Sequence, residues 1–174
     1  MKVFWFLMIC CMLVTGGARA GETVIVLTSS VFPHGGTIPV VYTSRGENVS
    51  PPLSWAAIPA DTESLALICD DPDAPRGTWT HWVIYNIPPT RTGIPENLPR
   101  DALLPNGARQ GINDFGMYGW DGPAPSSGTH QYVFTIYALD TMLDLAPGAT
   151  KTALLEAMRG HVLGRGKLIG TFGA

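Results

Sequence analysis

The fold is decided by the stretch at residues 64–87, which reads SLALICDDPDAPRGTWTHWVIYNI. It consists of two apolar runs, at residues 64–69 and 82–87, joined by a polar segment with three carboxylates, two prolines and a histidine. Nearly continuous apolar runs are typical of strands that are covered on both faces. We therefore expect two central strands, with the polar segment between them lining a pocket at the rim of the core.

The first 20 residues have the pattern of a secretory signal. Lys2 is followed by an uninterrupted apolar run at residues 3–14, and small residues follow that end in Ala18-Arg19-Ala20. The apolar run is shorter than the roughly 20 residues that a transmembrane helix needs. We expect cleavage after Ala20, no membrane anchor, and a secreted or periplasmic protein with one domain at residues 21–174.

Composition excludes several classes of protein. Of the 174 residues, 45% are hydrophobic and 14% are charged, which is typical of a globular domain and not of a disordered chain. Without the leader, 9 basic and 14 acidic side chains remain, a formal charge of −5 that argues against a nucleic-acid partner. Cys10 and Cys11 belong to the leader, so Cys69 has no partner for an intrachain disulfide, and its apolar neighbours indicate a small buried side chain.

The remaining pattern predicts a β-rich chain with one late helix. The helix is expected at residues 151–160, with Ala153, Leu154, Ala157 and Met158 at helical spacing, an N-cap at Thr150 or Thr152, and a stop at Gly160. The glycines and basic residues at 164–167 indicate a turn, and residues 88–128 show no clear period, as in functional loops. Further strands or extended segments are predicted at residues 23–27, 38–42, 49–55, 132–140 and 168–172.

Four polar groups stand at the ends of the strongest predicted strands. His81 and His130 each precede or begin a strand, and Asp71 and Asp73 follow the end of another. Convergence of the four at one sheet end would suit a transition metal, or a site in which carboxylates orient histidines that donate to an anion. The compact spacing of a metal site is missing, so we favour the anion pocket and expect no metal or cofactor.

Each of these residues also has a purely structural interpretation. A histidine at a strand end often makes a single structural hydrogen bond, and Asp71 and Asp73 could cap the turn and accept backbone amides, as Asx turns do. A nucleophile is not indicated, because the chain has no Gly-x-Ser-x-Gly elbow, and Ser126 and Ser127 precede His130 in a segment typical of an exposed linker.

Five motifs in a fixed order give the chain a resemblance to a known family. They lie at residues 48–55, 71–75, 81–88, 113–116 and 122–140. With these motifs the chain resembles the phosphatidylethanolamine-binding protein family, particularly its bacterial and archaeal branch. The resemblance implies a mainly β fold, with a large central antiparallel sheet, a smaller flanking sheet and a few helices.

The resemblance also implies a small anion pocket at one end of the sheet. Its lining would include Asp71, His81 and His130, with Asp73, Pro75, Trp79, Gly122 and Tyr132 nearby. In the family this pocket holds phosphate-like oxyanions, including the head group of phosphatidylethanolamine. A histidine held by a carboxylate can present N–H to an anion, so we expect stronger binding on acidification. We also expect a cis peptide bond between Ala74 and Pro75 that aims Asp73.

Two departures from the family pattern affect what can be carried over. Gln131 stands where the family usually has an arginine, which removes a cation that could brace the nearby carboxylates. The sequence given ends at Ala174, directly after the last predicted strand, without the C-terminal helix that flanks the pocket in animal members. We therefore expect a more open pocket.

The sequence leads to one preferred function and two alternatives. The preferred function is a secreted, non-enzymatic binding protein for a phosphate-bearing small molecule or lipid head group, which self-associates as a homodimer. One alternative is a regulator that engages an unidentified protein partner, as kinase- or protease-inhibiting relatives do. The other is a hydrolase that uses the histidines and carboxylates on a phosphoester.

Overall fold

The computed structural model describes residues 21–174. The predicted secretory signal, with Cys10 and Cys11, lies outside the described residues. Within residues 21–174, no helix has the length and apolar character needed to cross a bilayer. Cys69 is fully buried, as its apolar neighbours predicted, and burial raises the pKa of its thiol well above the usual value.

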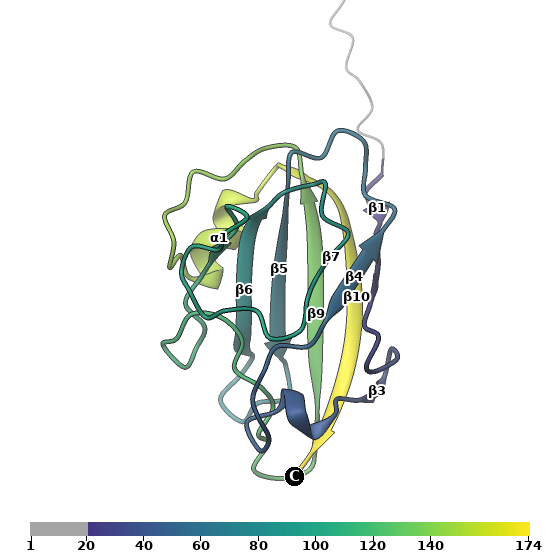
Figure 1. Ribbon diagram of the computed structural model, residues 1–174, viewed down its shortest axis with the longest axis vertical. Helices are drawn as coiled ribbons and strands as arrows, with labels where there is room; N and C mark the ends of the chain where they lie inside the picture. The colour runs from purple at the N-terminus through teal and green to yellow at the C-terminus, as the bar shows by residue number, and fades with distance from the viewer. Residues whose placement is uncertain (1–20) are drawn as a thin grey trace, which may run out of the picture.

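A seven-stranded sheet forms the centre of the described chain (Figure 1). Its order is β1-β10-β9-β5-β6-β8, with β3 also paired to β10. The pairs from β10 to β8 are antiparallel, whereas β1 and β3 run parallel to β10. The strands are β1 (Thr23–Val24), β3 (Gly36–Thr37), β5 (Ser64–Asp71), β6 (Trp79–Ile87), β8 (Arg109–Gln110), β9 (Thr129–Leu139) and β10 (Val162–Gly173).

The mainly β prediction is confirmed, but the large sheet is mixed rather than wholly antiparallel. The N-terminal segment follows the outer edge of β10 in the direction of that strand, pairing first at Gly164 and later at Gly170. The turn predicted at residues 164–167 is wrong, because these residues lie inside β10. Their glycines allow a close neighbour: a Cβ at Gly166 would lie 2.1 Å from the carbonyl oxygen of Ile25.

A three-stranded sheet covers one face of the large sheet. It consists of β2 (Val26–Thr28), β4 (Leu53–Ala56) and β7 (Gly93–Ile94) in the order β2-β4-β7. The main core lies between the sheets, where Leu53 and Trp55 pack in one cluster with Leu67, Trp82 and Phe134. The small sheet therefore walls the face of β5, β6 and β9 that carries Leu67, Trp82 and Phe134.

Helix α1 (Lys151–Ala157) lies by the other face of the large sheet, beside one end of β6 (Figure 1). Its predicted cap is confirmed, since the Thr150 hydroxyl accepts a hydrogen bond from the Ala153 amide at 3.3 Å. Leu154 and Met158 pack in a second cluster with Val83 and Tyr85 of β6.

The strand predicted at residues 38–42 is wrong, because Val40–Tyr42 form a 3₁₀ helix. Pro39 has φ −60°, and its carbonyl accepts the Tyr42 amide at 3.0 Å, so local turn bonds outweigh the β-branched composition. In the stretch at residues 88–128, where no element was predicted, the structure has the short strands β7 and β8 among turns.

Candidate functional site

A β-bulge determines which way His81 faces. In the pairing of β5 with β6, Cys69 lies opposite Trp82 and Asp70 lies opposite Thr80, so His81 is the one extra residue of β6. Successive side chains of a regular strand point to opposite faces, but a bulge breaks this alternation. His81 and Trp82 consequently share the face that is covered by the small sheet.

The other predicted residues reach the same face by ordinary alternation. Asp71 lies two residues after Cys69 on β5 and pairs with Trp79 of β6. Tyr132 and His130 precede Phe134, which lies opposite Cys69, by two and four residues of β9. The face at the end of β5 and the beginnings of β6 and β9 therefore carries Asp71, Trp79, His81, His130 and Tyr132. In Figure 1 this is the end of the sheet at which the C-terminus lies.

Asp71 and His130 are in direct contact. The Asp71 Oδ2 atom lies 2.7 Å from Nδ1 of His130, and its Oδ1 atom accepts the backbone amide of Asp73 at 2.8 Å. The Asp71 side chain is buried, so few waters compete for these two bonds. One carboxylate thus both caps the turn and orients a histidine, which joins the structural and the functional interpretations of the sequence.

Asp73 has the contact expected from its structural interpretation, a bond from a backbone amide. Its side chain is exposed, and Oδ2 accepts the backbone amide of Gln131 at 2.8 Å. This bond joins the loop after β5 to β9. The donor is the backbone amide of residue 131, the position at which the family usually has an arginine side chain. The predicted cis bond before Pro75 is wrong, because the described residues contain no cis peptide. The Asx turn on Asp71 and the Gln131 amide already position Asp73.

Pro75 lies at the margin of the site. It is exposed, and it borders a hollow of about 240 Å³ together with Ala74, Arg76 and Trp79. The hollow adjoins the indole of Trp79, so Pro75 belongs to the outer rim and does not reach the histidines through any hydrogen bond.

His81 is held by a backbone carbonyl. Its Nδ1 atom lies 2.5 Å from the carbonyl oxygen of Asp121, and only 3% of the residue is exposed. A carbonyl can only accept, so Nδ1 carries the proton. Burial lowers the pKa of His81, an effect that outweighs the opposing Asp121 bond and the charge of Asp71. The free protein therefore holds His81 as a neutral imidazole at neutral pH.

Asn48 fixes the segment that carries this carbonyl. Its Oδ1 atom accepts the Gly122 amide at 2.8 Å, and its Nδ2 donates to the Asp121 carboxylate at 2.8 Å. The predicted wall residue Gly122 is buried, and a Cβ there would lie 2.4 Å from the Tyr42 carbonyl oxygen. Gly122 therefore permits close packing behind His81. Asn48 and Asp121 were missed as site residues, although Asn48 begins one of the five motifs.

Aromatic side chains surround the His81 imidazole. Tyr132, which is buried, and Phe115, which is partly exposed, approach its ring edge-on with centroids 5.1 and 5.3 Å away. Burial raises the pKa of Tyr132 far above the ordinary value, so its hydroxyl stays protonated. Phe115 was not predicted as a site residue, but it lies in the motif at residues 113–116.

Trp79 supplies an unused donor. Its ring packs edge-on against Phe115 with the centroids 5.4 Å apart. Among the buried side-chain nitrogen and oxygen atoms of residues 21–174, only the indole Nε1 of Trp79 lacks a hydrogen-bond partner. Unpaired buried donors are costly in free energy, so this N–H would gain an acceptor if a local movement exposed it to a ligand.

Charge around the site is mixed. The nearby carboxylates of Asp71 and Asp121 are occupied by protein donors. Arg45 lies over the ring of Phe172 and donates to the carbonyls of Pro125 and Gly173. Because Phe172 pairs with His130, Arg45 brings a positive charge to this end of the sheet. The described residues contain no group of three or more His, Cys, Asp and Glu side chains arranged to hold a metal.

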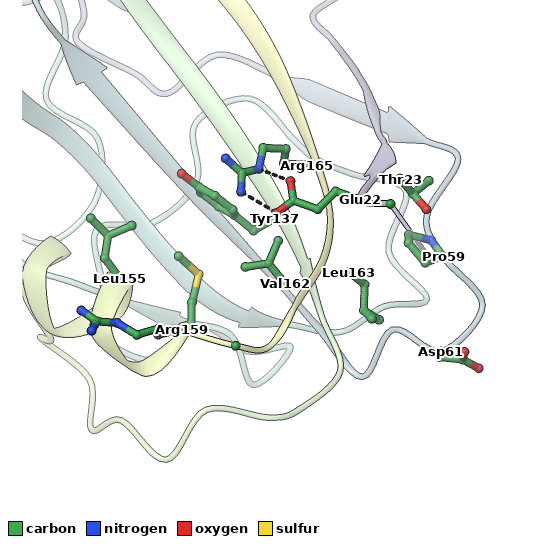
Figure 2. A pocket seen from close by; sticks show the side chains of 13 residues that line it. Glu22, Thr23, Pro59, Asp61, Tyr137, Leu155, Arg159, Val162, Leu163 and Arg165 are labelled. Atoms are coloured by element: carbon green, nitrogen blue, oxygen red, sulfur yellow. Dashed lines mark hydrogen bonds and ion pairs between the residues drawn. The ribbon is translucent and has the colours of Figure 1, made fainter. Parts of the chain in front are cut away.

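A larger cavity, of about 670 Å³, lies elsewhere (Figure 2). Its walls include Tyr137 of β9 and Arg165 of β10, and Arg165 forms an ion pair with Glu22 at 2.6 Å. Tyr137 is seven residues along β9 from His130, about 23 Å in an extended strand. The predicted histidine site and this cavity therefore occupy opposite ends of the sheet.

Two stacked sheets with an aspartate-oriented histidine at one end make up this fold and its candidate site, and the comparisons identify the family. A family model described as phosphatidylethanolamine-binding protein matches residues 28–173. A UPF0098 protein of Methanothermobacter thermautotrophicus is 59% identical over 146 residues, which covers 84% of this chain and 97% of the relative. One from Pyrococcus horikoshii is 45% identical over 155 residues, covering 87% and 78%.

Solved structures agree with the sequence relatives. The crystal structure of a phosphatidylethanolamine-binding protein homologue from Chlamydia trachomatis has a TM-score of 0.80 at 38% identity, over 87% of this chain and 98% of that one. E. coli YbcL, described as a member of the mammalian family, has a TM-score of 0.81 at 30% identity, over 87% and 99%. The chain belongs to the phosphatidylethanolamine-binding protein family, and this membership supports a binding-protein function.

Proposed function

We propose that this protein is a non-enzymatic binding protein that holds a phosphate-type group, of a small molecule or a lipid head group, between His81 and His130. The observation that carries the proposal is the 2.7 Å contact of His130 with the buried Asp71. With Nδ1 occupied by the carboxylate, Nε2 of His130 is the ring nitrogen left for a ligand. The bulge in β6 turns His81 to the same face.

The donors suit a small oxyanion better than a cation. The Trp79 indole N–H has no protein acceptor; because it is buried, it would donate to an anion only after a local movement, and it cannot bind a cation. The carboxylates that would attract a cation, Asp71 and Asp121, already accept from protein groups. Arg45 adds a positive charge at the same end of the sheet.

We expect His130→Ala and His81→Ala each to weaken binding of inorganic phosphate and phosphoethanolamine about 10- to 100-fold, the loss of one hydrogen bond to a charged group. Isothermal titration calorimetry at mildly acidic pH measures the affinities. His161→Ala is the matched control, because His161 also pairs with an aspartate, Asp140 at 2.8 Å, but is more exposed and lies at the other end of β9. Equal affinities in all three variants would refute the proposed site.

The same proteins separate the two alternative functions. Turnover of a panel of phosphoesters, lost in His81→Ala and His130→Ala, would replace the binding function by a hydrolase. Stoichiometric binding of a protein partner by both histidine variants would instead support the regulator, with its binding surface outside the histidine site.

We also propose that the protein acts outside the cytoplasm, on the evidence of the apolar run and the Ala18-Arg19-Ala20 pattern. The mature protein is then expected to begin at Gly21. Intact-mass measurement of protein from a secretion-competent host checks this. A mass that retains residues 1–20 in the exported fraction would contradict it.

A further inference from the structure

The two ring nitrogens of His81 are not equivalent. Nδ1 donates its proton to the Asp121 carbonyl, and a neutral imidazole has only one N–H. Nε2 of the neutral ring therefore carries a lone pair and can only accept. A fully ionised oxyanion oxygen also only accepts, so the two atoms repel each other as the protein stands at neutral pH.

Nε2 of His81 is open to a ligand. Nε2 makes no hydrogen bond to any described residue. Within residues 21–174 the only buried side-chain nitrogen or oxygen without a partner is Nε1 of Trp79, so an unpartnered Nε2 of His81 is not itself buried. Nε2 thus reaches accessible space although the rest of the residue is buried. The ring cannot easily turn to exchange its nitrogens, because Asn48 and Gly122 hold the Asp121 segment in place.

We propose that binding of a phosphate group at this site takes up one proton, which resides on Nε2 of His81 and is donated to a ligand oxygen. This inference rests on the proposed phosphate-binding function and adds a regulation to it. The uncharged ring of the free protein becomes an imidazolium in the complex, so the site holds an anion together with its proton and releases both when the pH rises.

The charges that face His81 allow this change. On β5, the carboxylates of Asp70 and Asp71 favour the imidazolium, as does Asp121 on the segment beneath the ring. From β9, Tyr132 contributes an uncharged phenol, and His130 stands behind Asp71. Burial outweighs the three carboxylates in the free protein and lowers the pKa of His81. A bound anion next to Nε2 adds a further negative charge, which raises the pKa of His81 and favours its protonated form.

The test is phosphate titration calorimetry at mildly alkaline pH in buffers of different ionisation enthalpy, which counts the protons taken up. The wild-type protein is expected to take up about one proton more per phosphate than His81→Gln does, with affinity falling about tenfold more steeply per pH unit than in that variant. His81→Gln places an amide N–H near the position of Nε2, so this variant should bind phosphate with about one proton fewer taken up and with a flatter pH profile than the wild type. His161→Gln is the control and should match the wild type.

A second readout does not depend on a variant. Nitrogen-detected NMR of the wild-type histidine rings should show Nε2 of His81 unprotonated in the free protein and both nitrogens protonated at phosphate saturation. Phosphate binding without proton uptake, or an unchanged His81 ring, would overturn the inference while leaving the proposed function intact. Proton uptake that is as large in His81→Gln as in the wild type would assign the proton to another group and also overturn it. Absence of phosphate binding to the wild type would overturn both.

Discussion

Asp71→Ala is expected to abolish measurable phosphate binding and to lower the free energy of unfolding by about 3 kcal/mol. Both carboxylate oxygens are used, one by the His130 imidazole and one by the Asp73 amide. The alanine leaves the His130 imidazole and the Asp73 amide without an acceptor in a partly buried place, and each such group costs about 1–3 kcal/mol when buried. It also leaves His130 free to turn its ring away from the site. Denaturant unfolding and calorimetry measure the two effects.

The chain offers a matched control for this substitution. Asp140 accepts from His161 at 2.8 Å, close to the Asp71–His130 distance, but both side chains of that pair are more than a third exposed. Exposed pairs contribute at most about 1 kcal/mol, so Asp140→Ala should change stability little and phosphate affinity not at all. Similar losses in both variants would show that burial does not distinguish the two pairs.

Gly122→Ala is expected to destabilise the protein by about 3 kcal/mol, at the upper end of overpacking effects. The added Cβ would lie 2.4 Å from the Tyr42 carbonyl oxygen and 2.7 Å from the Thr43 Cα atom. Both neighbours are backbone atoms that cannot rotate away, so the chain at residues 121–122 must move. Because the Asp121 carbonyl holds His81, phosphate affinity should fall as well. Thermal unfolding and calorimetry test this.

Gly173→Ala is the control for added volume at the same end of the sheet. Its Cβ would lie 3.3 Å from the Thr129 hydroxyl, a side-chain atom that can shift. We expect near wild-type stability and affinity. A Gly122→Ala protein as stable as Gly173→Ala would show that the contact with the Tyr42 carbonyl relaxes at little cost.

The sheet could be predicted largely from apolar runs. Residues 64–69 and 82–87 are covered on both faces and residues 132–139 largely so, which makes nearly every position apolar, and the strands stand out. The short strands β7 and β8 could not be predicted, because two-residue pairings leave no periodic pattern. The 3₁₀ turn at Val40–Tyr42 was hidden by strand-forming residues that local turn bonds override.

The site could be predicted as a set of residue types but not as a geometry. His81, His130 and Asp71 stood out because polar groups at strand ends are unusual beside apolar runs. The hydrogen-bond partner of His81 could not be predicted, since it is the backbone carbonyl of residue 121, which any residue at that position would supply. The conformation of Ala74–Pro75 was predicted wrongly, because the bond from Gln131 to Asp73 depends on a strand that is distant in sequence.

The β6 bulge makes strand length a component of the site. Deleting Thr80 would keep His81 and nearly the whole composition of the strand, yet it would remove the offset that lets His81 and Trp82 share a face. A relative that keeps the histidine but lacks the extra residue would direct the imidazole towards the helix side. In this family, an ungapped alignment across β6 is therefore as informative about binding as the presence of the histidine itself.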